Sequence, residues 1–325
     1  MKILVTGGAG FIGSWFVKYF LKNHPDGRVV TLDKLTYAGN LKNLAEVIND
    51  PRHSFVKGDI CDPKTARKAM EGVAAVVHFA AESHVDRSID NASVFLETNV
   101  VGTGVLLDAA KASGVAKFVH VSTDEVYGSI NSGFFTEDSN LRPNSPYSAS
   151  KAGSDLLALA FFATHGLPAV VTRCSNNFGP YQFPEKLMSL FITNAIDGVP
   201  LPIYGDGLYT RDWIFVEDHC AAVDLVLRKG KPGEVYNIGG EKDRTNLEIT
   251  DLILEKMGKS KSLKTFVKDR PGHDRRYAID SSKIERELGW KPNHSFEAAI
   301  ELTIAWYVAN ESWWREIKAG KRTAP

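Results

Sequence analysis

The chain has 325 residues, enough for about two domains or for one large α/β unit with a smaller companion. Lys plus Arg and Asp plus Glu both number 39, so the formal net charge is zero. This balance excludes a global basic field that would collect nucleic acid or an anionic membrane surface, and we therefore expect small or local partners.

The cysteines Cys61, Cys174 and Cys220 are odd in number and lack the spacing of a disulfide framework or a zinc site. They predict buried thiols in a reducing compartment, and nothing in the sequence suggests a metal. The N-terminal apolar run breaks at Gly7, which is too early for a secretory signal, and no apolar stretch approaches the length of a membrane span. We expect a cytoplasmic protein.

The chain begins with a short apolar strand at residues 2–6, a glycine loop at residues 7–13 and an apolar-periodic helix. The loop matches both Gly-x-x-Gly-x-x-Gly and Gly-x-Gly-x-x-Gly, which lets the backbone turn tightly and brings a pyrophosphate onto the helix N-terminus. The next strand ends in Asp33, twenty residues after Gly13. A carboxylate there accepts hydrogen bonds from both ribose hydroxyls and repels a 2′-phosphate. The pattern predicts NAD in preference to NADP, although Lys34 beside Asp33 slightly weakens this inference.

Strands and helices then continue to alternate. The predicted strands are nearly continuous apolar runs, as in a parallel sheet covered on both faces, and Asp59 follows one of them where it can reach an adenine amine. We expect strands at 54–56, 73–79, 118–122 and 169–173, with a helix at 98–112. This alternation predicts an α/β fold with a Rossmann-type doubly wound parallel sheet and a ligand at the carboxyl ends of its strands.

From about residue 176 the alternation loosens, and Pro and Gly punctuation predicts loops around the other half of a ligand. A helix at 216–227 and a strand at 235–238 are expected to return to the first domain. The predicted NAD-binding domain is therefore 1–175 and 214–238, and the smaller α/β substrate domain is 176–213 and 239–325. Further helices are expected at 246–257 and 295–309, with Trp306, Tyr307, Trp313 and Trp314 as packing residues.

Tyr147 and Lys151 are four residues apart on a predicted helix that Ser145 caps and Pro146 opens. An ammonium one turn from a phenol favours the ionised phenol, which makes a base of the pair. A lone Tyr-x-x-x-Lys is more often a surface pair, but the glycine loop changes that balance. The apolar run at 156–162 is expected to bury the rest of the helix.

Two adjacent carboxylates, Asp124 and Glu125, follow an apolar strand and Thr123. Two carboxyls with separated pKa values suit general acid and base chemistry, although acids also decorate helix N-termini without a catalytic role. Consecutive strand residues point to opposite faces, so both acids reach one substrate only if the strand ends by Thr123. We therefore expect a loop or helix start at 124–125.

Thr123 followed by Val126-Tyr127-Gly128, with Tyr147 and Lys151 downstream, resembles the extended short-chain dehydrogenase/reductase family that acts on nucleotide sugars. Within it, Thr123-Asp124-Glu125 is similar to the branch of 4,6-dehydratases that take dTDP-glucose. Further matching segments span nearly the whole chain: 33–39, 81–87, 184–187, 211–213 and 269–273. Phe178 and Met188-Ser189 depart from the more usual Tyr and Ile-Pro, which leaves pocket detail open.

This resemblance implies a redox-neutral, NAD-dependent conversion of dTDP-glucose to dTDP-4-keto-6-deoxyglucose and water, in deoxysugar biosynthesis. The implied catalytic residues are Thr123, Asp124, Glu125, Tyr147 and Lys151. The implied cofactor-binding residues are Gly7, Gly10, Phe11, Ile12, Gly13, Asp33, Lys34, Leu35, Thr36, Asp59, Ile60, Ala80, Ala81, Ser83, Thr98, Tyr147, Lys151 and Asn177. The implied substrate-binding residues are Ser83, Thr123, Asn176, Lys186, Leu187, Pro202, Tyr204, Arg211, Asn246, Arg270, His273 and Tyr277. Arg211 and Arg270 suit a diphosphate because guanidinium binds phosphate oxygens bidentately, whereas His273 is equally explained as a structural histidine.

The resemblance also implies a homodimer with helices such as 153–163 partly at the interface. Three alternatives remain open. A 4-epimerase or decarboxylase on the same fold would not need both Asp124 and Glu125, a UDP- or GDP-sugar would use the same scaffold, and a non-catalytic NAD-binding regulator would not need the Tyr147 and Lys151 pair.

Overall fold

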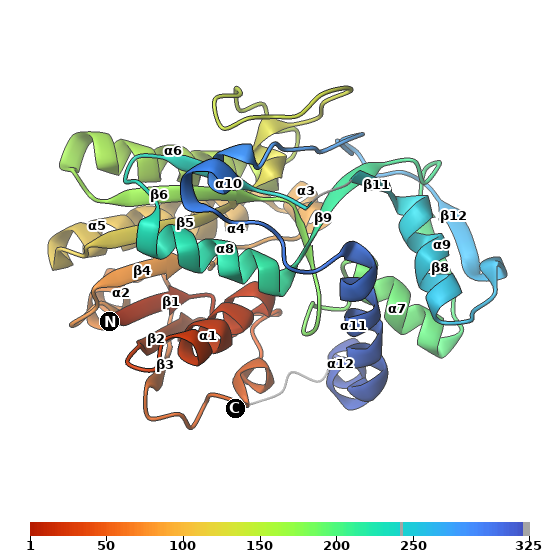
Figure 1. Ribbon diagram of the computed structural model, residues 1–325, viewed down its shortest axis with the longest axis horizontal. Helices are drawn as coiled ribbons and strands as arrows, with labels where there is room; N and C mark the ends of the chain where they lie inside the picture. The colour runs from red at the N-terminus through yellow and green to blue at the C-terminus, as the bar shows by residue number, and fades with distance from the viewer. Residues whose placement is uncertain (241–242, 321–325) are drawn as a thin grey trace.

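The computed structural model describes residues 1–240 and 243–320. Within them, seven parallel strands form one sheet in the order β10-β6-β5-β4-β1-β2-β3 (Figure 1). These strands are β1 (Lys2–Thr6), β2 (Arg28–Asp33), β3 (His53–Lys57), β4 (Ala75–His78), β5 (Lys117–Thr123), β6 (Ala169–Cys174) and β10 (Val235–Ile238). The strand order reverses at β1, which confirms the predicted doubly wound, Rossmann-type fold.

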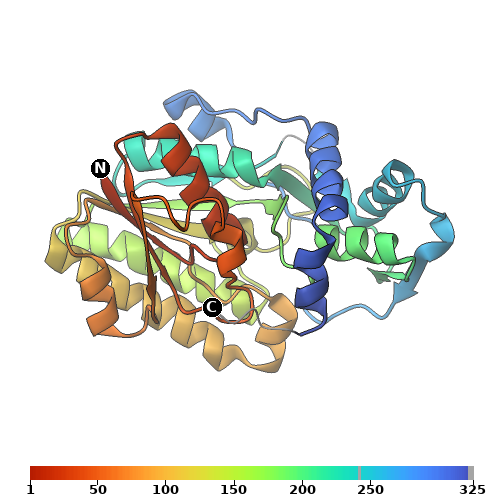
Figure 2. The ribbon, with the colours of Figure 1, turned by 90° about the horizontal axis from the view of Figure 1, so that it is seen from below.

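Helices cover both faces of this sheet, as Figure 2 shows. On one face lie α1 (Phe11–Asn23) and α8 (Val216–Lys229), and on the other lie α2 (Pro63–Ala69), α5 (Thr103–Ser113) and α6 (Pro146–His165). Successive residues of β1 supply both cores, because Ile3 and Val5 pack in one apolar cluster and Leu4 packs in the other. Burial on both faces explains why the strands are continuous apolar runs.

A second lobe lies at one end of the large sheet (Figure 1). It contains a three-stranded sheet of β7 (Asn176–Phe178), β9 (Thr210–Phe215) and β11 (Asp243–Thr245), and the parallel pair β8 (Leu201–Tyr204) and β12 (Lys264–Val267). Its helices are α7 (Leu187–Asp197), α9 (Asn246–Lys256), α11 (Phe296–Ala309) and α12 (Glu311–Lys318). The shorter remaining elements are η1 (Leu41–Leu44), α3 (Val85–Asp90), α4 (Ala92–Phe95), η4 (Lys261–Leu263) and α10 (Ser282–Leu288).

The helix and strand expected to return to the first sheet do so as α8 and β10, and α9 and α11 match the two predicted helices. The division into two domains stays a prediction, and part of it, at residues 241–242 and 321–325, lies outside the described residues.

The helix expected at 98–112 is confirmed, but it is not uniform, because residues Leu96–Gly102 wind as a π-helix, η2, before α5 begins. The Asn99 amide there bonds to the backbone of Glu82 on a neighbouring loop, a tertiary contact that local periodicity does not encode. The expectation that the apolar run of α6 is buried is wrong in part, since Leu156 is 58% exposed.

The tail residues Tyr307, Trp313 and Trp314 are buried, as predicted for packing residues. In the described part of the chain, no helix combines the length and apolar character needed to span a bilayer.

Candidate active site

A cavity of about 500 Å³ opens at the carboxyl ends of the parallel strands, where the fold predicts a ligand. Its lining includes the five predicted catalytic residues and all of the predicted cofactor residues except Leu35. Leu35 nevertheless helps to orient a residue that does line the cavity, because its backbone N–H donates to Asp33 Oδ1 at 2.8 Å.

The glycine loop leaves room for a ligand where side chains would not fit. Gly7 has a φ of +69°, and a Cβ built there would lie 2.6 Å from the backbone nitrogen of Ala80. Gly10 is the N-cap of α1 and makes no side-chain cap bond, while the first-turn residues Phe11 and Ile12 line the cavity. This arrangement fits a dinucleotide pyrophosphate against the positive end of the helix.

Asp33 is buried at the end of β2 and accepts backbone hydrogen bonds from Ala9 and Leu35 on different oxygens. Each oxygen keeps a further lone pair, so the carboxylate can still accept ribose hydroxyls. Lys34 is paired with Asp59 at 2.6 Å and does not neutralise Asp33 directly. This pairing removes part of the argument against NAD that Lys34 raised.

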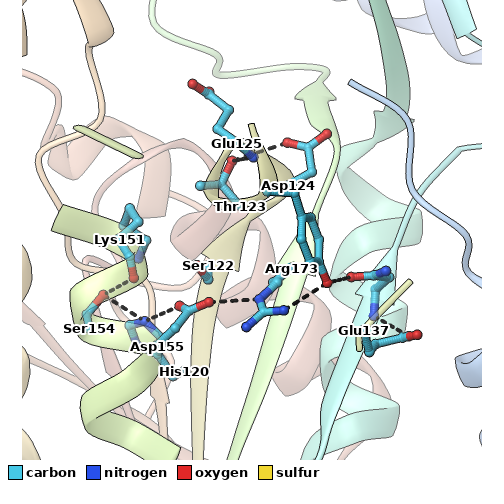
Figure 3. Close-up of polar contacts among 12 residues, drawn as sticks. His120, Ser122, Thr123, Asp124, Glu125, Glu137, Lys151, Ser154, Asp155 and Arg173 are labelled. Carbon is cyan, nitrogen blue, oxygen red and sulfur yellow. Dashed lines mark hydrogen bonds and ion pairs between the residues drawn. The ribbon is translucent and has the colours of Figure 1, made fainter. Parts of the chain in front are cut away.

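The strand β5 ends at Thr123, and the 3-10 helix η3 (Asp124–Tyr127) begins immediately afterwards. Thr123 is its N-cap, with Oγ1 accepting from the Glu125 backbone N–H at 3.3 Å. This break confirms the expected end of the strand at the two acids. Figure 3 shows the side chains of Asp124 and Glu125 at the end of β5, with Lys151 on the neighbouring helix α6.

Burial raises the pKa of Asp124 well above its usual value, and the Glu125 charge adds to this shift. Burial also raises the pKa of Glu125, but the Lys186, Arg270 and Arg211 charges oppose it. Asp124 Oδ2 is buried and has no hydrogen-bond partner among the described residues. The two neighbouring carboxyls therefore differ, with Asp124 favouring the protonated form.

Tyr147 and Lys151 lie on α6, whose N-terminus has the predicted Ser145 cap and Pro146. Ser145 and Ser148 form a reciprocal capping box. Burial lowers the pKa of Lys151 to about 8, and its Nζ donates to the Val121 carbonyl at 2.8 Å.

The expectation that Lys151 lowers the pKa of Tyr147 is wrong for this structure. Burial raises that pKa well above 10, and the Glu125 charge raises it further. The Lys151 ammonium contacts a backbone carbonyl of β5, and the low-dielectric surroundings dominate the phenol. A hydrogen bond with the Thr123 side chain partly offsets the effect of burial.

The predicted substrate residues divide into two groups. Five line the cavity: Ser83, Thr123, Asn176, Lys186 and Leu187. Seven do not: Pro202, Tyr204, Arg211, Asn246, Arg270, His273 and Tyr277.

Two pairs within the second group are in contact, Arg211 with Tyr277 and Tyr204 with His273, and other members have partners outside the group. Arg211 is buried and its guanidinium lies 4.2 Å from the Tyr277 ring centroid. Arg270 is paired with Asp86 at 3.0 Å. His273 Nδ1 lies 2.7 Å from Asp269 Oδ1, so this side chain has the partner expected of a structural histidine. The charges of Arg211 and Arg270 still act on Glu125, which ties this cluster electrostatically to the cavity.

Some residues that line the cavity were not predicted from the sequence. Tyr37 and Phe183 form an edge-to-face aromatic pair, and the guanidinium of Arg87 lies 3.7 Å from the Tyr37 ring centroid. Trp313 lines the cavity as well as packing in the tail. Tyr37 lies in a matching segment and was recoverable from it, whereas no local signal brings a residue near the C-terminus to the cavity.

Buried polar atoms without a partner among the described residues also gather here, including Asn176 Oδ1 and Asn177 Oδ1. Such atoms are rare in folded proteins and indicate a ligand or water position. Across residues 1–240 and 243–320, no group of three or more His, Cys, Asp or Glu side chains is arranged to hold a metal ion.

Comparisons with known proteins agree with this geometry. Residues 4–303 match a family model described as GDP-mannose 4,6 dehydratase. A dTDP-glucose 4,6-dehydratase of Actinoplanes sp. is 56% identical over 97% of this chain and 100% of the relative. One of Escherichia coli is 51% identical over 98% of this chain and 96% of the relative.

A solved dTDP-glucose 4,6-dehydratase from Streptomyces venezuelae, with NAD and dTDP bound, superposes with a TM-score of 0.96 at 55% identity. The match covers 98% of this chain and 100% of that one. A UDP-glucuronic acid 4-epimerase from Bacillus cereus has a TM-score of 0.90 at 31% identity, covering 95% of this chain and 99% of that one. The shared fold therefore extends to epimerases, while sequence identity is higher with the dehydratases.

Proposed function

The chain belongs to the dTDP-glucose 4,6-dehydratases of the extended short-chain dehydrogenase/reductase family, and we propose how its residues divide the work of that reaction. The reaction is the redox-neutral conversion of dTDP-glucose to dTDP-4-keto-6-deoxyglucose and water, a step towards deoxysugars. The observation that carries the assignment is the pair Asp124 and Glu125, at the end of β5, in the same cavity as Tyr147 and Lys151. An epimerase would not need both acids.

NAD fits the cavity. The glycine loop and the α1 N-terminus would hold its pyrophosphate, and Asp33 would accept its adenosine ribose hydroxyls. When bound, NAD supplies a hydride acceptor and donor and a positive charge that favours ionisation of a nearby phenol.

In the oxidation half of the reaction, Tyr147 removes the proton of the C4 hydroxyl. Thr123, which shares a hydrogen bond with the phenol, orients the same sugar oxygen. Lys151 follows one helical turn later and is the second member of this pair, with its Nζ on the Val121 carbonyl. Since the folded environment raises the pKa of Tyr147, the positive charge of bound NAD would be needed to favour the phenolate that acts as the base.

In the elimination half, oxidation at C4 makes the C5 proton acidic because it then lies alpha to a ketone. Glu125 takes that proton. Asp124, held protonated by burial, gives its own proton to the departing C6 hydroxyl, which leaves as water. The proton on Glu125 exchanges with solvent before C5 regains a proton from it, and C6 receives the hydride that C4 lost, so the sugar ends with no net change in oxidation state. The proton that Tyr147 took and the one that Asp124 gave balance through solvent.

The nucleotide end of the substrate is assigned to cationic residues. Lys186 lines the cavity, and Arg211 and Arg270 lie beyond its lining but influence Glu125 electrostatically. Guanidinium groups suit a diphosphate, which supports Arg211 and Arg270 as its ligands. The choice of thymine as the base of the substrate nucleotide rests on the similarity to dTDP-glucose 4,6-dehydratases.

The function is tested by incubating the NAD-loaded protein with dTDP-glucose in heavy water without external reductant. The expected product has lost one water and carries one solvent deuterium, at C5. A product of unchanged mass containing a galactose isomer would indicate an epimerase. Turnover of a UDP- or GDP-sugar but not of dTDP-glucose would overturn the choice of nucleotide.

We also propose a homodimer. Leu96 and Val101 on η2 and Leu156 on α6 are each more than half exposed, and η2 and α6 lie against each other. Large exposed apolar patches mark protein interfaces, which supports a contact between copies through this surface. The three free thiols support a cytoplasmic location, because a reducing compartment keeps cysteines unpaired. The two-segment division into NAD-binding and substrate domains is part of the same proposal.

A further inference from the structure

A set of buried polar contacts lies behind the catalytic residues, between α6 and the sheet (Figure 3). Arg173 Nε donates to Asp155 Oδ2 at 2.9 Å, and Arg173 Nη1 donates to the Tyr127 hydroxyl oxygen at 2.8 Å. The Tyr127 hydroxyl in turn donates to Asn237 Oδ1 at 2.8 Å. We call Asp155, Arg173, Tyr127 and Asn237 the Arg173 cluster.

The Arg173 cluster joins the two elements that carry the catalytic groups. Asp155 lies on α6, one turn after Lys151 and two turns after Tyr147. Tyr127 is the last residue of η3, two residues after Glu125. One guanidinium therefore contacts both the helix of the proposed oxidation pair and the short helix of the proposed acid/base pair.

Sheet register places the cluster under these elements. On the neighbouring strands β5, β6 and β10, Ser122 is paired with Arg173, and Arg173 is paired with Asn237. Register partners in adjacent strands present their side chains on the same face of the sheet. Arg173 thus lies on β6, the middle one of these three strands, and its guanidinium contacts both α6 and η3 from that strand.

The contacts are buried and directional. Asp155 and Asn237 have no exposed surface, and Arg173 is 3% exposed. The planar guanidinium presents donors in a fixed fork, so contact with Asp155 and Tyr127 together fixes its orientation. The Tyr127 ring is also stacked on Phe135, with ring centroids 5.1 Å apart. This stacking fixes the ring and therefore the position of its hydroxyl.

A second branch reaches the backbone of Lys151. His120 Nε2 lies 3.3 Å from Asp155 Oδ1 and 3.1 Å from Ser154 Oγ, and Ser154 donates to the Lys151 carbonyl at 2.8 Å. Burial lowers the pKa of Lys151 to about 8, and the Asp155 carboxylate opposes that shift. The cluster therefore touches α6 at the turn that holds the catalytic lysine.

We propose that Arg173 and Tyr127 are positioning residues that fix η3, with Asp124 and Glu125, relative to α6, with Tyr147 and Lys151. The role rests on the proposed function, in which one bound sugar meets both pairs in succession without leaving the cavity. Such a reaction needs the acid/base pair held to within a fraction of an ångström of positions set by the oxidation pair. The Tyr127 hydroxyl is the link on the η3 side.

Tyr127→Phe is the decisive variant. It removes one hydroxyl, keeps the stacked ring, and leaves the buried Asp155 and Arg173 pair intact. Replacing Arg173 by an apolar residue would strand a buried carboxylate and risks unfolding. The matched control is Tyr236→Phe, since Tyr236 is a buried tyrosine of β10 that packs on the opposite face of the sheet from Asn237, where its hydroxyl bonds to Glu287.

The experiment follows single turnovers of the NAD-loaded protein on dTDP-glucose. Near-ultraviolet absorbance reports reduced nicotinamide, and quenched-flow mass spectrometry reports loss of water. Tyr127→Phe is expected to leave oxidation at the unmodified rate and to slow elimination ~10-fold or more, because small misplacements of catalytic groups cost ~10- to 100-fold. Reduced nicotinamide then accumulates, and the isotope effect of C5-deuterated substrate on product formation increases.

Two further readouts separate positioning from general damage. The affinities of Tyr127→Phe for NAD and for dTDP, measured by calorimetry, are expected to be unchanged. Arg173→Lys, which keeps the charge beside Asp155 but lacks the fork, is expected to slow elimination selectively in the same way. Tyr236→Phe is expected to match the unmodified protein in every measurement.

An unchanged elimination rate and isotope effect in Tyr127→Phe would overturn the positioning role. Equal slowing of oxidation and elimination would also overturn it, because that result indicates only a structural role. If the unmodified protein fails to dehydrate dTDP-glucose, the proposed function falls, and this inference falls with it.

Discussion

At the residue scale, Asp124 and Glu125 are adjacent acids that differ in burial and in the charges that act on them. Asp124 is 2% exposed and its Oδ2 has no partner among the described residues, so burial favours a proton on it. Glu125 is only partly buried, and three cationic side chains act on it. Adjacent carboxyls held in different protonation states can serve as acid and base in one step.

The first prediction concerns this pair. Asp124→Asn combined with Glu125→Gln is expected to retain partial reduction of NAD by dTDP-glucose and to slow water elimination by ~100-fold or more, since acid and base catalysis are both removed. Absorbance and product mass measure the two steps. Asp108→Asn, at an exposed carboxylate on α5, is the control. Full dehydration by the double variant would contradict the assignment of acid and base.

The second prediction concerns Tyr147. Tyr147→Phe keeps the ring but removes the group that takes the C4 hydroxyl proton, so reduction of NAD by substrate is expected to fall by ~100-fold or more. The readout is nicotinamide absorbance in a single turnover, with Tyr236→Phe again as the control. Normal reduction by Tyr147→Phe would remove this residue from the mechanism.

At the scale of elements, the turn from β5 into η3 decides whether two consecutive acids serve one site. An extended strand continued through Glu125 would have sent their side chains to opposite faces. Thr123 ends the strand and caps the 3-10 helix through its hydroxyl. The same side chain therefore sets the local geometry of the acids and lies beside Tyr147.

Helix α8 carries His219, a buried histidine that has no proposed role and whose burial lowers the stability of the fold at acidic pH. His219 is fully buried, and neither ring nitrogen has a hydrogen-bond partner among the described residues. Burial lowers its pKa from 6.5 to about 3. Below pH 6.5 the unfolded chain binds a proton at this residue that the folded protein does not, so folding stability falls as the pH falls.

The third prediction follows from that sign. His219→Leu removes this titrating group. The free energy of unfolding of the variant is therefore expected to rise relative to that of the unmodified protein by about 1.4 kcal/mol per pH unit below 6.5, or about 2 kcal/mol near pH ~5. Urea unfolding at neutral pH and at the lower pH measures the difference between the two proteins. A gap that does not widen on acidification would show that His219 is not held neutral.

At the scale of the whole molecule, exposed apolar side chains lie on η2 and on α6, the helix that carries Tyr147 and Lys151, and these two elements are in contact. The fourth prediction is that Leu156→Glu places charge in the proposed interface and shifts the protein from dimer to monomer in sedimentation. Leu302→Glu on α11, at a residue similarly exposed, is expected to leave the dimer intact. A monomeric unmodified protein at working concentration would contradict the dimer.

The sequence determined the features that depend on neighbours a few residues apart. The glycine loop, the alternation of apolar strands with helices, the cap at Ser145 and the spacing of Tyr147 from Lys151 are all local patterns, and the fold follows them. The proposed catalytic residues were predicted for the same reason, since each lies in a short motif at a strand end or on one helix face, and their roles stay a prediction.

Only the tertiary structure decided the environment of those groups. The raised pKa of Tyr147, the pairing of Lys34 with Asp59 and the separation of seven substrate residues from the cavity lining depend on segments brought together by folding. The bond between Tyr127 and Asn237 spans 110 residues of sequence. Burial and electrostatics sum over every neighbour in space, whereas propensity and periodicity act over a few residues. The sequence therefore predicted which groups react, and the fold set the charge and alignment of those groups.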